Sequence, residues 1–312
     1  METRRLGATD LEVSVLGLGC NNFGMKIGVD ETRSVVDAAI DAGINFFDTA
    51  DMYGETRSEQ FLGEVLEGRR DSVLLATKFG GMAMVSGDSE WGKREAIVEC
   101  VEASLRRLRT DRIDLYQIHY PDPKTPVAET LTALGELMQA GKVRAVGCSN
   151  FTPEQLDEAG SVTGTASFQS VQNEWSLLQR EVETQLVPIC EKQGVGFLPY
   201  FPLASGVLTG KYKRGSAFGE GTRLATMGDY FGHFGSDENL AKVEALASFA
   251  EERGHSLLEL AFGWLASQPC VASVIAGATR PDQIQANANA MGWRLTDSER
   301  ARVDEIVTPP SS

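Results

Sequence analysis

Short apolar runs alternate with amphipathic segments along the whole chain. Eight runs are almost continuously apolar, as expected of parallel strands that are buried on both faces. They cover residues 15–19, 44–47, 73–77, 115–118, 143–146, 167–171, 195–198 and 271–275. Between these runs, apolar residues recur at helical spacing, and Asp30 is the expected N-cap of the first such helix. Helices are predicted over about residues 30–43, 59–66, 97–108, 127–140, from Thr152 onward, 182–193, 240–252, 257–266 and 281–290.

This repetition predicts one α/β fold, a (β/α)8 TIM barrel. Eight strand–helix units in a chain of 312 residues favour a barrel over a doubly wound sheet. Residues 4–13 predict a short N-terminal hairpin at the bottom of the barrel, and residues 296–307 an extra C-terminal helix. Because no low-complexity linker interrupts the pattern, we expect residues 1–312 to form a single barrel domain.

The charge balance narrows the classes of partner. With 29 basic and 44 acidic residues, the net charge is −15, which argues against binding to nucleic acids or anionic membranes. No apolar run reaches the roughly 18 residues of a membrane helix, and no signal-peptide pattern follows Met1. The five cysteines are widely spaced without a C-x-x-C pair, as is typical of reduced thiols. We therefore expect a cytoplasmic protein and no membrane contact.

Polar residues follow the predicted strands at the end where barrel enzymes place their active sites. Asp48, Lys78 and His119 follow the second, third and fourth strands, and Tyr53 lies in the loop after Asp48. Any one of them could simply cap a helix or face solvent, but the four together predict an acid–base set. We expect the other two histidines, His233 and His255, to be structural or exposed. Later strands end in Ser149, Asn150, Gln172, Asn173, Tyr200, Gly277, Thr279 and Arg280.

These four side chains suit proton delivery to a carbonyl oxygen. A free tyrosine has a pKa of about 10, and a neighbouring Lys78 ammonium would lower it. Asp48 would hold Lys78, and His119 could orient a substrate oxygen. No metal is expected, because His119 has no histidine or cysteine partner at ligand spacing. The alternative use of Lys78, as a Schiff-base nucleophile of a lyase, is disfavoured if Asp48 pairs with it and raises its pKa.

Two segments could bind phosphate groups, although neither carries a complete motif. The glycines of residues 17–22 do not complete a Rossmann fingerprint, and residues 206–211 fall one residue short of a P-loop. Each glycine pair could therefore only mark a tight turn. Residues 205–211 could still wrap a pyrophosphate with backbone amides and Lys211, and Arg280 begins the last predicted helix of the barrel, where a phosphate is also favoured.

Several of these motifs together resemble the aldo-keto reductase superfamily over nearly the whole chain, in particular its bacterial-type and potassium-channel-β-like branch. The resemblance rests on residues 43–55, 76–79, 117–119, 147–151 and 200–203. It implies NAD(P)H-dependent reduction of an aldehyde or ketone, or the reverse oxidation of an alcohol or sugar. By this resemblance Tyr53 is the general acid, tuned by Lys78 and Asp48, and His119 orients the carbonyl.

The same resemblance implies how a dinucleotide would be held. Ser149, Asn150 and Gln172 would bind the nicotinamide carboxamide, and Tyr200 would stack on the ring. Gly277 and Gln283 stand where many members carry basic residues for the 2′-phosphate, and Arg280 could replace that charge. This favours NADP(H), with NAD(H) as the alternative. The remaining cofactor residues implied are Pro202, Leu203, Ser205, Gly206 and Lys211 over the pyrophosphate, and Thr279 and Asn287 at the adenine end.

The substrate would be a small carbonyl compound or alcohol. Little chain follows the last predicted helix, so substrate choice would fall to Phe23, Met25, Trp91 and Tyr120 and to the loop 212–237. The loop 212–237 is either a mobile surface loop or a lid, with Phe218, Tyr230, Phe231 and Phe234 as its aromatic residues. A second hypothesis is a regulatory subunit that senses the cofactor and turns over slowly.

Overall fold

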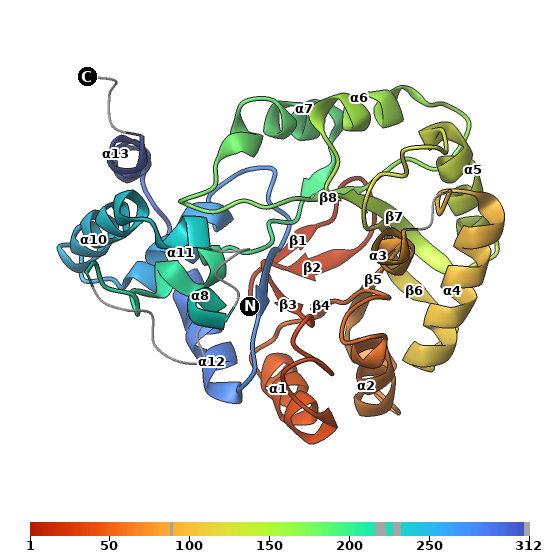
Figure 1. Ribbon diagram of the computed structural model, residues 1–312, viewed down its shortest axis with the longest axis horizontal. Helices are drawn as coiled ribbons and strands as arrows, with labels where there is room; N and C mark the ends of the chain where they lie inside the picture. The colour runs from red at the N-terminus through yellow and green to blue at the C-terminus, as the bar shows by residue number, and fades with distance from the viewer. Residues whose placement is uncertain (88–89, 216–222, 227–231, 309–312) are drawn as a thin grey trace.

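Eight parallel strands form the centre of the molecule. The computed structural model describes residues 1–87, 90–215, 223–226 and 232–308, and the strands follow one another around a single sheet in the order β10-β3-β4-β5-β6-β7-β8-β9 (Figure 1). Their bounds are β3 Leu16–Gly19, β4 Phe46–Asp48, β5 Leu74–Phe79, β6 Ile113–Ile118, β7 Val143–Ser149, β8 Ser170–Gln172, β9 Gly196–Phe197 and β10 Val274–Gly277.

Backbone hydrogen bonds close this sheet into a ring. β9 meets the chain just before β10, where the Phe197 amide donates to the Cys270 carbonyl at 2.7 Å and the Ala272 amide donates to the Phe197 carbonyl at 2.9 Å. On the other side, β10 pairs with β3 in parallel register. The predicted (β/α)8 barrel is therefore confirmed.

An N-terminal hairpin covers one end of the ring. Its strands β1 (Thr3–Arg5) and β2 (Glu12–Ser14) pair antiparallel, as the sequence predicts. Leu6, Leu11 and Val13 are buried in one apolar cluster with barrel-strand residues such as Phe46 and Leu198. This packing leaves the opposite end, where the strands have their carboxyl termini, available for a site.

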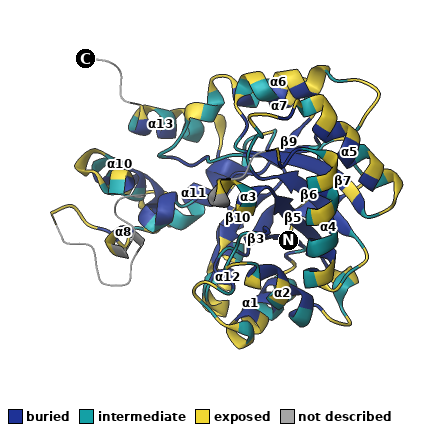
Figure 2. Cartoon of the chain, turned by 45° about the vertical axis from the view of Figure 1, so that its right-hand side comes forward, coloured by how far each residue is buried: buried dark blue, intermediate teal, exposed yellow. Residues whose placement is uncertain are grey.

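Helices surround the sheet and turn their polar faces outward, so Figure 2 shows buried strands inside a ring of partly exposed helices. The sequence did not predict two short helices, α3 (Gly81–Ser86) and α8 (Arg223–Thr226). It also did not predict the 3-10 turns η1 (Arg70–Ser72), η2 (Glu181–Glu183), η3 (Ala204–Thr209), η4 (Gly232–Gly235) and η5 (Ala290–Gly292). The longer helices are α1 Val29–Asp41, α2 Arg57–Val65, α4 Arg94–Leu108, α5 Val127–Gln139, α6 Pro153–Ser161, α7 Leu186–Gln193, α10 Asp237–Glu251, α11 Leu257–Ala266, α12 Pro281–Asn289 and α13 Asp297–Val307. The last of these is the predicted extra C-terminal helix.

Local capping signals explain where two of these helices begin. Thr152 caps α6, because its hydroxyl accepts from the Gln155 amide while the Gln155 side chain accepts from the Thr152 amide. The expectation that Asp30 caps α1 is wrong. Gly28 is the N-cap, and its amide donates to the Glu31 carboxylate at 3.1 Å, so the helix starts earlier.

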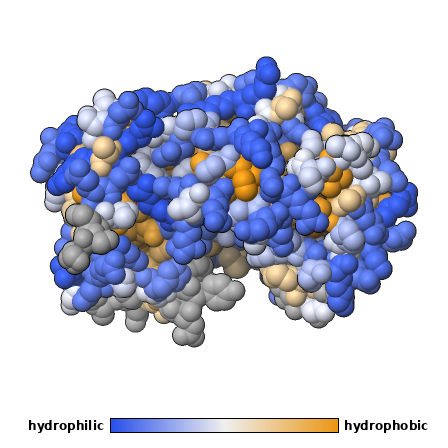
Figure 3. All heavy atoms as spheres, turned by 90° about the horizontal axis from the view of Figure 1, so that it is seen from above, coloured by the Kyte–Doolittle hydropathy of each residue, from blue (hydrophilic) through white to orange (hydrophobic). Residues whose placement is uncertain are grey.

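The outer surface is mostly hydrophilic in the view of Figure 3, where apolar residues form only limited patches. In the part of the chain that the structure describes, no helix is both long and apolar enough to cross a bilayer.

Candidate active site

A cavity of about 830 Å³ opens at the carboxyl ends of the barrel strands. Asp48, Tyr53 and His119 all line it, and Lys78 lies directly behind them. Strand register explains this arrangement, because β5 and β6 pair Lys78 with Gln117 while β7 and β8 pair Ser149 with Gln172. Side chains that are far apart in the sequence therefore reach one level of the barrel.

Lys78 joins Asp48 to Tyr53 in a buried chain of polar contacts. Its ammonium donates to Asp48 Oδ2 at 2.7 Å and to the Thr49 carbonyl at 2.8 Å, and lies 3.4 Å from the Tyr53 hydroxyl. Asp48 Oδ1 accepts from the side-chain amides of Gln117, at 3.2 Å, and Gln172, at 3.0 Å. Both Asp48 oxygens are thus fixed, and Asp48 holds the ammonium in place.

The charge of Lys78 is favoured by its partners. Burial acts to lower the pKa of Lys78, but the Asp48 carboxylate and Tyr53 outweigh burial, and the pKa is raised above its usual value. A lysine that stays protonated is a poor nucleophile. This geometry weighs against the Schiff-base alternative.

The expected fall in the pKa of Tyr53 is not what the structure supports. Burial of the phenol raises the pKa, and although Lys78 acts in the lowering direction as expected, the net shift is upward. Tyr53 therefore keeps its proton at neutral pH. An acid that donates a proton to a carbonyl oxygen needs this state, and Lys78 stabilises the phenolate that is left.

His119 lies beside this chain as a neutral imidazole. Burial, and then the nearby Lys78 charge, hold the pKa of His119 well below 6.5. Its ring packs edge-on against Tyr53 with 5.7 Å between centroids and stacks on Tyr120 at 4.8 Å. These contacts fix the ring at the cavity wall next to the phenol.

Residues expected to hold a nicotinamide group also line the cavity. The Ser149 hydroxyl donates to the Gln172 carbonyl at 2.7 Å, and the Asn150 side-chain amide donates to the His119 carbonyl at 2.9 Å. The Tyr200 hydroxyl donates to Asn150 Oδ1 at 2.8 Å, so Tyr200 is connected to the other residues expected at the nicotinamide. Thirteen of the cofactor residues predicted from the sequence line the cavity: Ser149, Asn150, Gln172, Tyr200, Pro202, Leu203, Ser205, Gly206, Lys211, Gly277, Thr279, Arg280 and Gln283.

Residues 205–211, which are expected to lie over a pyrophosphate, contain a strained turn that would let the backbone approach the ligand closely. Ser205 and Gly206 have positive φ angles of 57° and 92° within η3. A Cβ on Gly206 would lie 2.9 Å from the Lys211 ammonium, and the Ser205 hydroxyl is buried without a hydrogen-bond partner in the described chain. Such a turn can present amides, a hydroxyl and a cation to an anion.

Some expected site residues lie elsewhere. Asn287 is buried on α12 and is not part of the cavity wall. Of the expected substrate residues, only Tyr120 lines the cavity. Phe23 and Trp91 are buried in the core, and Met25 is 57% exposed. Trp91 contacts the cavity wall indirectly, because its indole N–H donates at 3.0 Å to the carbonyl of Tyr120, which lines the cavity.

His233 is exposed, as expected, but together with its neighbour Phe234 it also lines the cavity from η4. His255 does have the structural role expected, packed on Trp293 with 4.1 Å between ring centroids. Phe218, Tyr230 and Phe231, the other aromatic residues of the supposed lid, lie outside the described residues.

Sequence reasoning also missed several lining residues. Glu174 could have been found, because it directly follows the strand-end pair Gln172 and Asn173. Burial raises the pKa of Glu174 to about 7, with Glu181 adding to this effect. Other lining residues outside the predicted set include Asn21, Asn22, Lys26, Met52 and Phe201.

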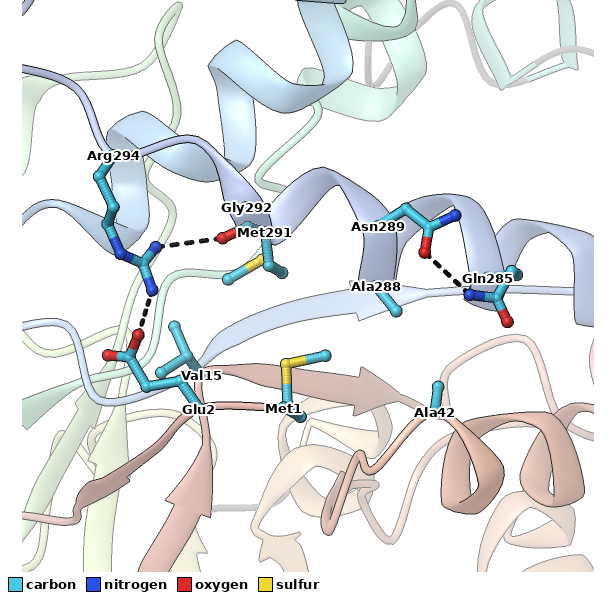
Figure 4. Close-up of a pocket in the computed structure, with 10 residues that line it drawn as sticks. All are labelled: Met1, Glu2, Val15, Ala42, Gln285, Ala288, Asn289, Met291, Gly292 and Arg294. Atoms are coloured by element: carbon cyan, nitrogen blue, oxygen red, sulfur yellow. Dashed lines mark hydrogen bonds and ion pairs between the residues drawn. The ribbon is translucent and has the colours of Figure 1, made fainter.

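A smaller cavity of about 310 Å³ lies at the other end of the barrel, between the chain start, α1 and α12. Figure 4 shows that Arg294 points to Glu2, with which it forms an ion pair, and that the Asn289 and Gln285 side chains bond to each other. No acid–base set comparable to Tyr53 and His119 lines this cavity. Within the described ranges, no group of three or more histidine, cysteine or acidic side chains could hold a metal ion.

Comparison with known proteins agrees with this geometry. The aldo/keto reductase family model matches residues 15–308. The chain is 37% identical over 314 residues to aldo-keto reductase YhdN of Bacillus subtilis (strain 168), across 98% of this chain and 94% of the relative. It is 36% identical over 306 residues to a probable voltage-gated potassium channel subunit beta of Arabidopsis thaliana, across 93% of this chain and 91% of the relative.

Solved structures give the same result. The glycerol dehydrogenase AKR11B4 from Gluconobacter oxydans superposes with a TM-score of 0.84 at 33% identity, covering 100% of this chain and 97% of that one. The holo form of aldo-keto reductase AKR11C1 from Bacillus halodurans superposes with a TM-score of 0.79 at 32% identity, covering 98% of this chain and 96% of that one. The barrel and its site thus define an oxidoreductase that acts on carbonyls or alcohols. The chain belongs to the aldo/keto reductase family, whose members generally use nicotinamide cofactors.

Proposed function

We propose that this protein is an NADP(H)-dependent enzyme that interconverts a small aldehyde or ketone with its alcohol, with Tyr53 as the acid–base residue. The observation that carries this proposal is the buried chain from Asp48 through Lys78 to the Tyr53 hydroxyl, beside a neutral His119. A protonated phenol next to an ammonium and an imidazole fits proton transfer to and from a carbonyl oxygen.

The cavity wall fits a nicotinamide dinucleotide. Ser205 Oγ and Asn22 Oδ1 are buried, line the cavity and have no hydrogen-bond partner among the described residues, so both can bind polar groups of a ligand. Ser149, Asn150 and Gln172 are assigned to the nicotinamide carboxamide, and Tyr200 to the ring. When bound, the nicotinamide supplies or accepts the hydride.

The side chains then move one proton. In reduction, the Tyr53 hydroxyl donates its proton to the carbonyl oxygen as the carbon receives the hydride, and Lys78 stabilises the phenolate. His119 binds the same oxygen and orients the carbonyl. In oxidation the phenolate takes the alcohol proton, so the same two groups serve both directions.

The preference for NADP(H) rests on Arg280, which lines the cavity just before α12. Its guanidinium is held by Asp282 through two hydrogen bonds of 2.9 Å each. A 2′-phosphate at this position would share the guanidinium with Asp282, as arginine can bind two acidic groups at once. Lys26 lines the same cavity and adds positive charge.

A second candidate is a regulatory subunit that binds the cofactor and turns over slowly. The 36% identity to a probable channel β subunit favours it. The complete acid–base set argues for turnover, because a purely cofactor-sensing protein does not need Tyr53, Lys78 and His119 together.

A fluorescence titration with NADPH and NADH tests the cofactor assignment. We expect both to bind and NADPH to bind more tightly. Tighter binding of NADH would contradict the NADP(H) assignment, and failure of both to bind would contradict the proposed function.

A further inference from the structure

The geometry points to Asp51 as a positioning residue that decides which ring nitrogen of His119 carries the proton. This inference rests on the proposed function, because the His119 tautomer matters only if its ring faces a substrate oxygen. The consequence would be a preference for reduction or oxidation that is set by pH.

Asp51 and His119 approach the same small space. A Cβ on Gly81, the first residue of α3, would lie 2.7 Å from His119 Nδ1 and 3.0 Å from Asp51 Oδ1. Both atoms are buried, and neither has a hydrogen-bond partner among the described residues. Two polar atoms buried in this way are expected to satisfy each other, directly after a small rotation or through one bridging water.

The backbone holds Asp51 at this point. Its amide donates at 3.0 Å to the carbonyl of Lys78, which lies within β5. Because Gly81 has no side chain, none of its atoms separates the carboxyl from the imidazole, and the Met52 sulfur borders the same space. Since Nδ1 is on the buried side of a ring that lines the cavity, Nε2 is the nitrogen that a substrate would meet.

The surroundings of Asp51 let it titrate near neutrality. Burial raises the pKa of Asp51 to about 7, Glu59 of α2 adds to this rise, and Arg107 of α4 and the Met52 and Met82 amides oppose it. Glu59 is itself engaged by Arg107 and by the Thr77 hydroxyl. The other titratable groups near the Asp51 carboxyl are Cys100 of α4 and Tyr116 of β6, whose pKa values burial raises, so both are neutral near pH 7.

Two hydrogen-bonded states follow. When Asp51 is protonated, it donates to Nδ1, and the neutral ring carries its proton on Nε2, where it can donate to a carbonyl oxygen. When Asp51 is ionised, it accepts from Nδ1–H, and Nε2 presents a lone pair that can accept from an alcohol hydroxyl. Low pH therefore favours carbonyl reduction, and high pH favours alcohol oxidation, without any change in the charge of His119.

The test is a nitrogen-15 NMR titration of the protein labelled at histidine, of which there are only three. It is made without cofactor, so it does not depend on turnover. We expect the His119 signals to pass from the Nε2–H to the Nδ1–H tautomer with a midpoint near pH 7. Asp51→Asn should abolish this transition, because an amide does not titrate.

Glu174→Gln is the matched control, since Glu174 is a second carboxyl of the described chain whose pKa is raised to about 7. It should leave the His119 tautomer transition in place. A His119 tautomer that stays constant from pH 6 to pH 8 in the wild type would overturn the inference, as would a transition that survives in Asp51→Asn. Protonation of His119 to imidazolium in this range would also overturn it.

An activity profile separates this inference from the proposed function. With the wild type, kcat/KM for reduction should fall about tenfold between pH 6 and pH 8, as expected for one controlling group with a pKa near 7. Asp51→Asn should flatten this profile and still turn over. A flat wild-type profile with good turnover would refute the role of Asp51 alone, whereas no turnover at any pH would refute the proposed function.

Discussion

Lys78 Nζ lies 2.7 Å from Asp48 Oδ2, and both side chains are almost fully removed from solvent. Removing both charges of this ion pair from water costs free energy, which indicates that the pair has a functional role. The ammonium reaches the Tyr53 hydroxyl, and the pair therefore connects the barrel core to the reacting end of the cavity.

Replacing Tyr53 with Phe should lower kcat by about two to four orders of magnitude, because the reaction then lacks its proton donor. NADPH affinity should change little. The measurement is steady-state cofactor oxidation with an aldehyde. Tyr116→Phe is the matched control, since its buried hydroxyl has no partner in the described chain. Comparable rates for Tyr53→Phe and the wild type would refute the assignment.

Replacing Lys78 with Met should destabilise the fold as well as stop catalysis, because Asp48 would be left as an unpaired buried charge. Removal of one partner from a buried pair typically costs about 3–5 kcal/mol of unfolding free energy, measured here by urea denaturation. Lys93→Met, which breaks the exposed pair with Glu90, should change the free energy of unfolding far less, because solvent screens that pair. Equal effects of the two changes would show that the buried pair has no structural role.

Arg280→Ala should weaken NADPH binding about 5- to 30-fold more than NADH binding, if its guanidinium contacts the 2′-phosphate through a charge-assisted hydrogen bond. Asp282→Ala, which removes the partner of Arg280, should leave NADPH binding unchanged or tighter. Fluorescence titration measures both. Loss of affinity for the two cofactors to the same extent would remove Arg280 from the phosphate site.

Borohydride should not trap a carbonyl substrate on Lys78, because the lysine is kept protonated by Asp48. Mass spectrometry of the treated protein gives the answer. A stable adduct on Lys78 would instead support the Schiff-base alternative.

Much of the fold was predictable from local patterns. All eight barrel strands overlap the predicted apolar runs, although β8 and β10 begin about three residues later than predicted, and the Thr152 cap follows directly from its capping box. α3 was not predictable in this way, because its six residues lack the length for a helical period. This helix matters nonetheless, because Asp51 and His119 both lie next to its first residue, Gly81.

The strand-end part of the candidate site was also predictable, because barrel topology places Asp48, Lys78 and His119 at one level. Loop residues were harder to place. Phe23 and Trp91 are buried in the core, whereas His233 reaches the cavity, and tertiary packing decides both outcomes. A sequence pattern marks strand ends but does not say which way a loop turns.

The most direct test of the central claim is the stoichiometry of NADPH oxidation by the purified protein with a panel of aldehydes and ketones. An oxidoreductase with Tyr53 as its acid should oxidise many equivalents of NADPH per active site at a constant rate. Oxidation that stops after one equivalent with every compound would contradict this account and favour the regulatory subunit.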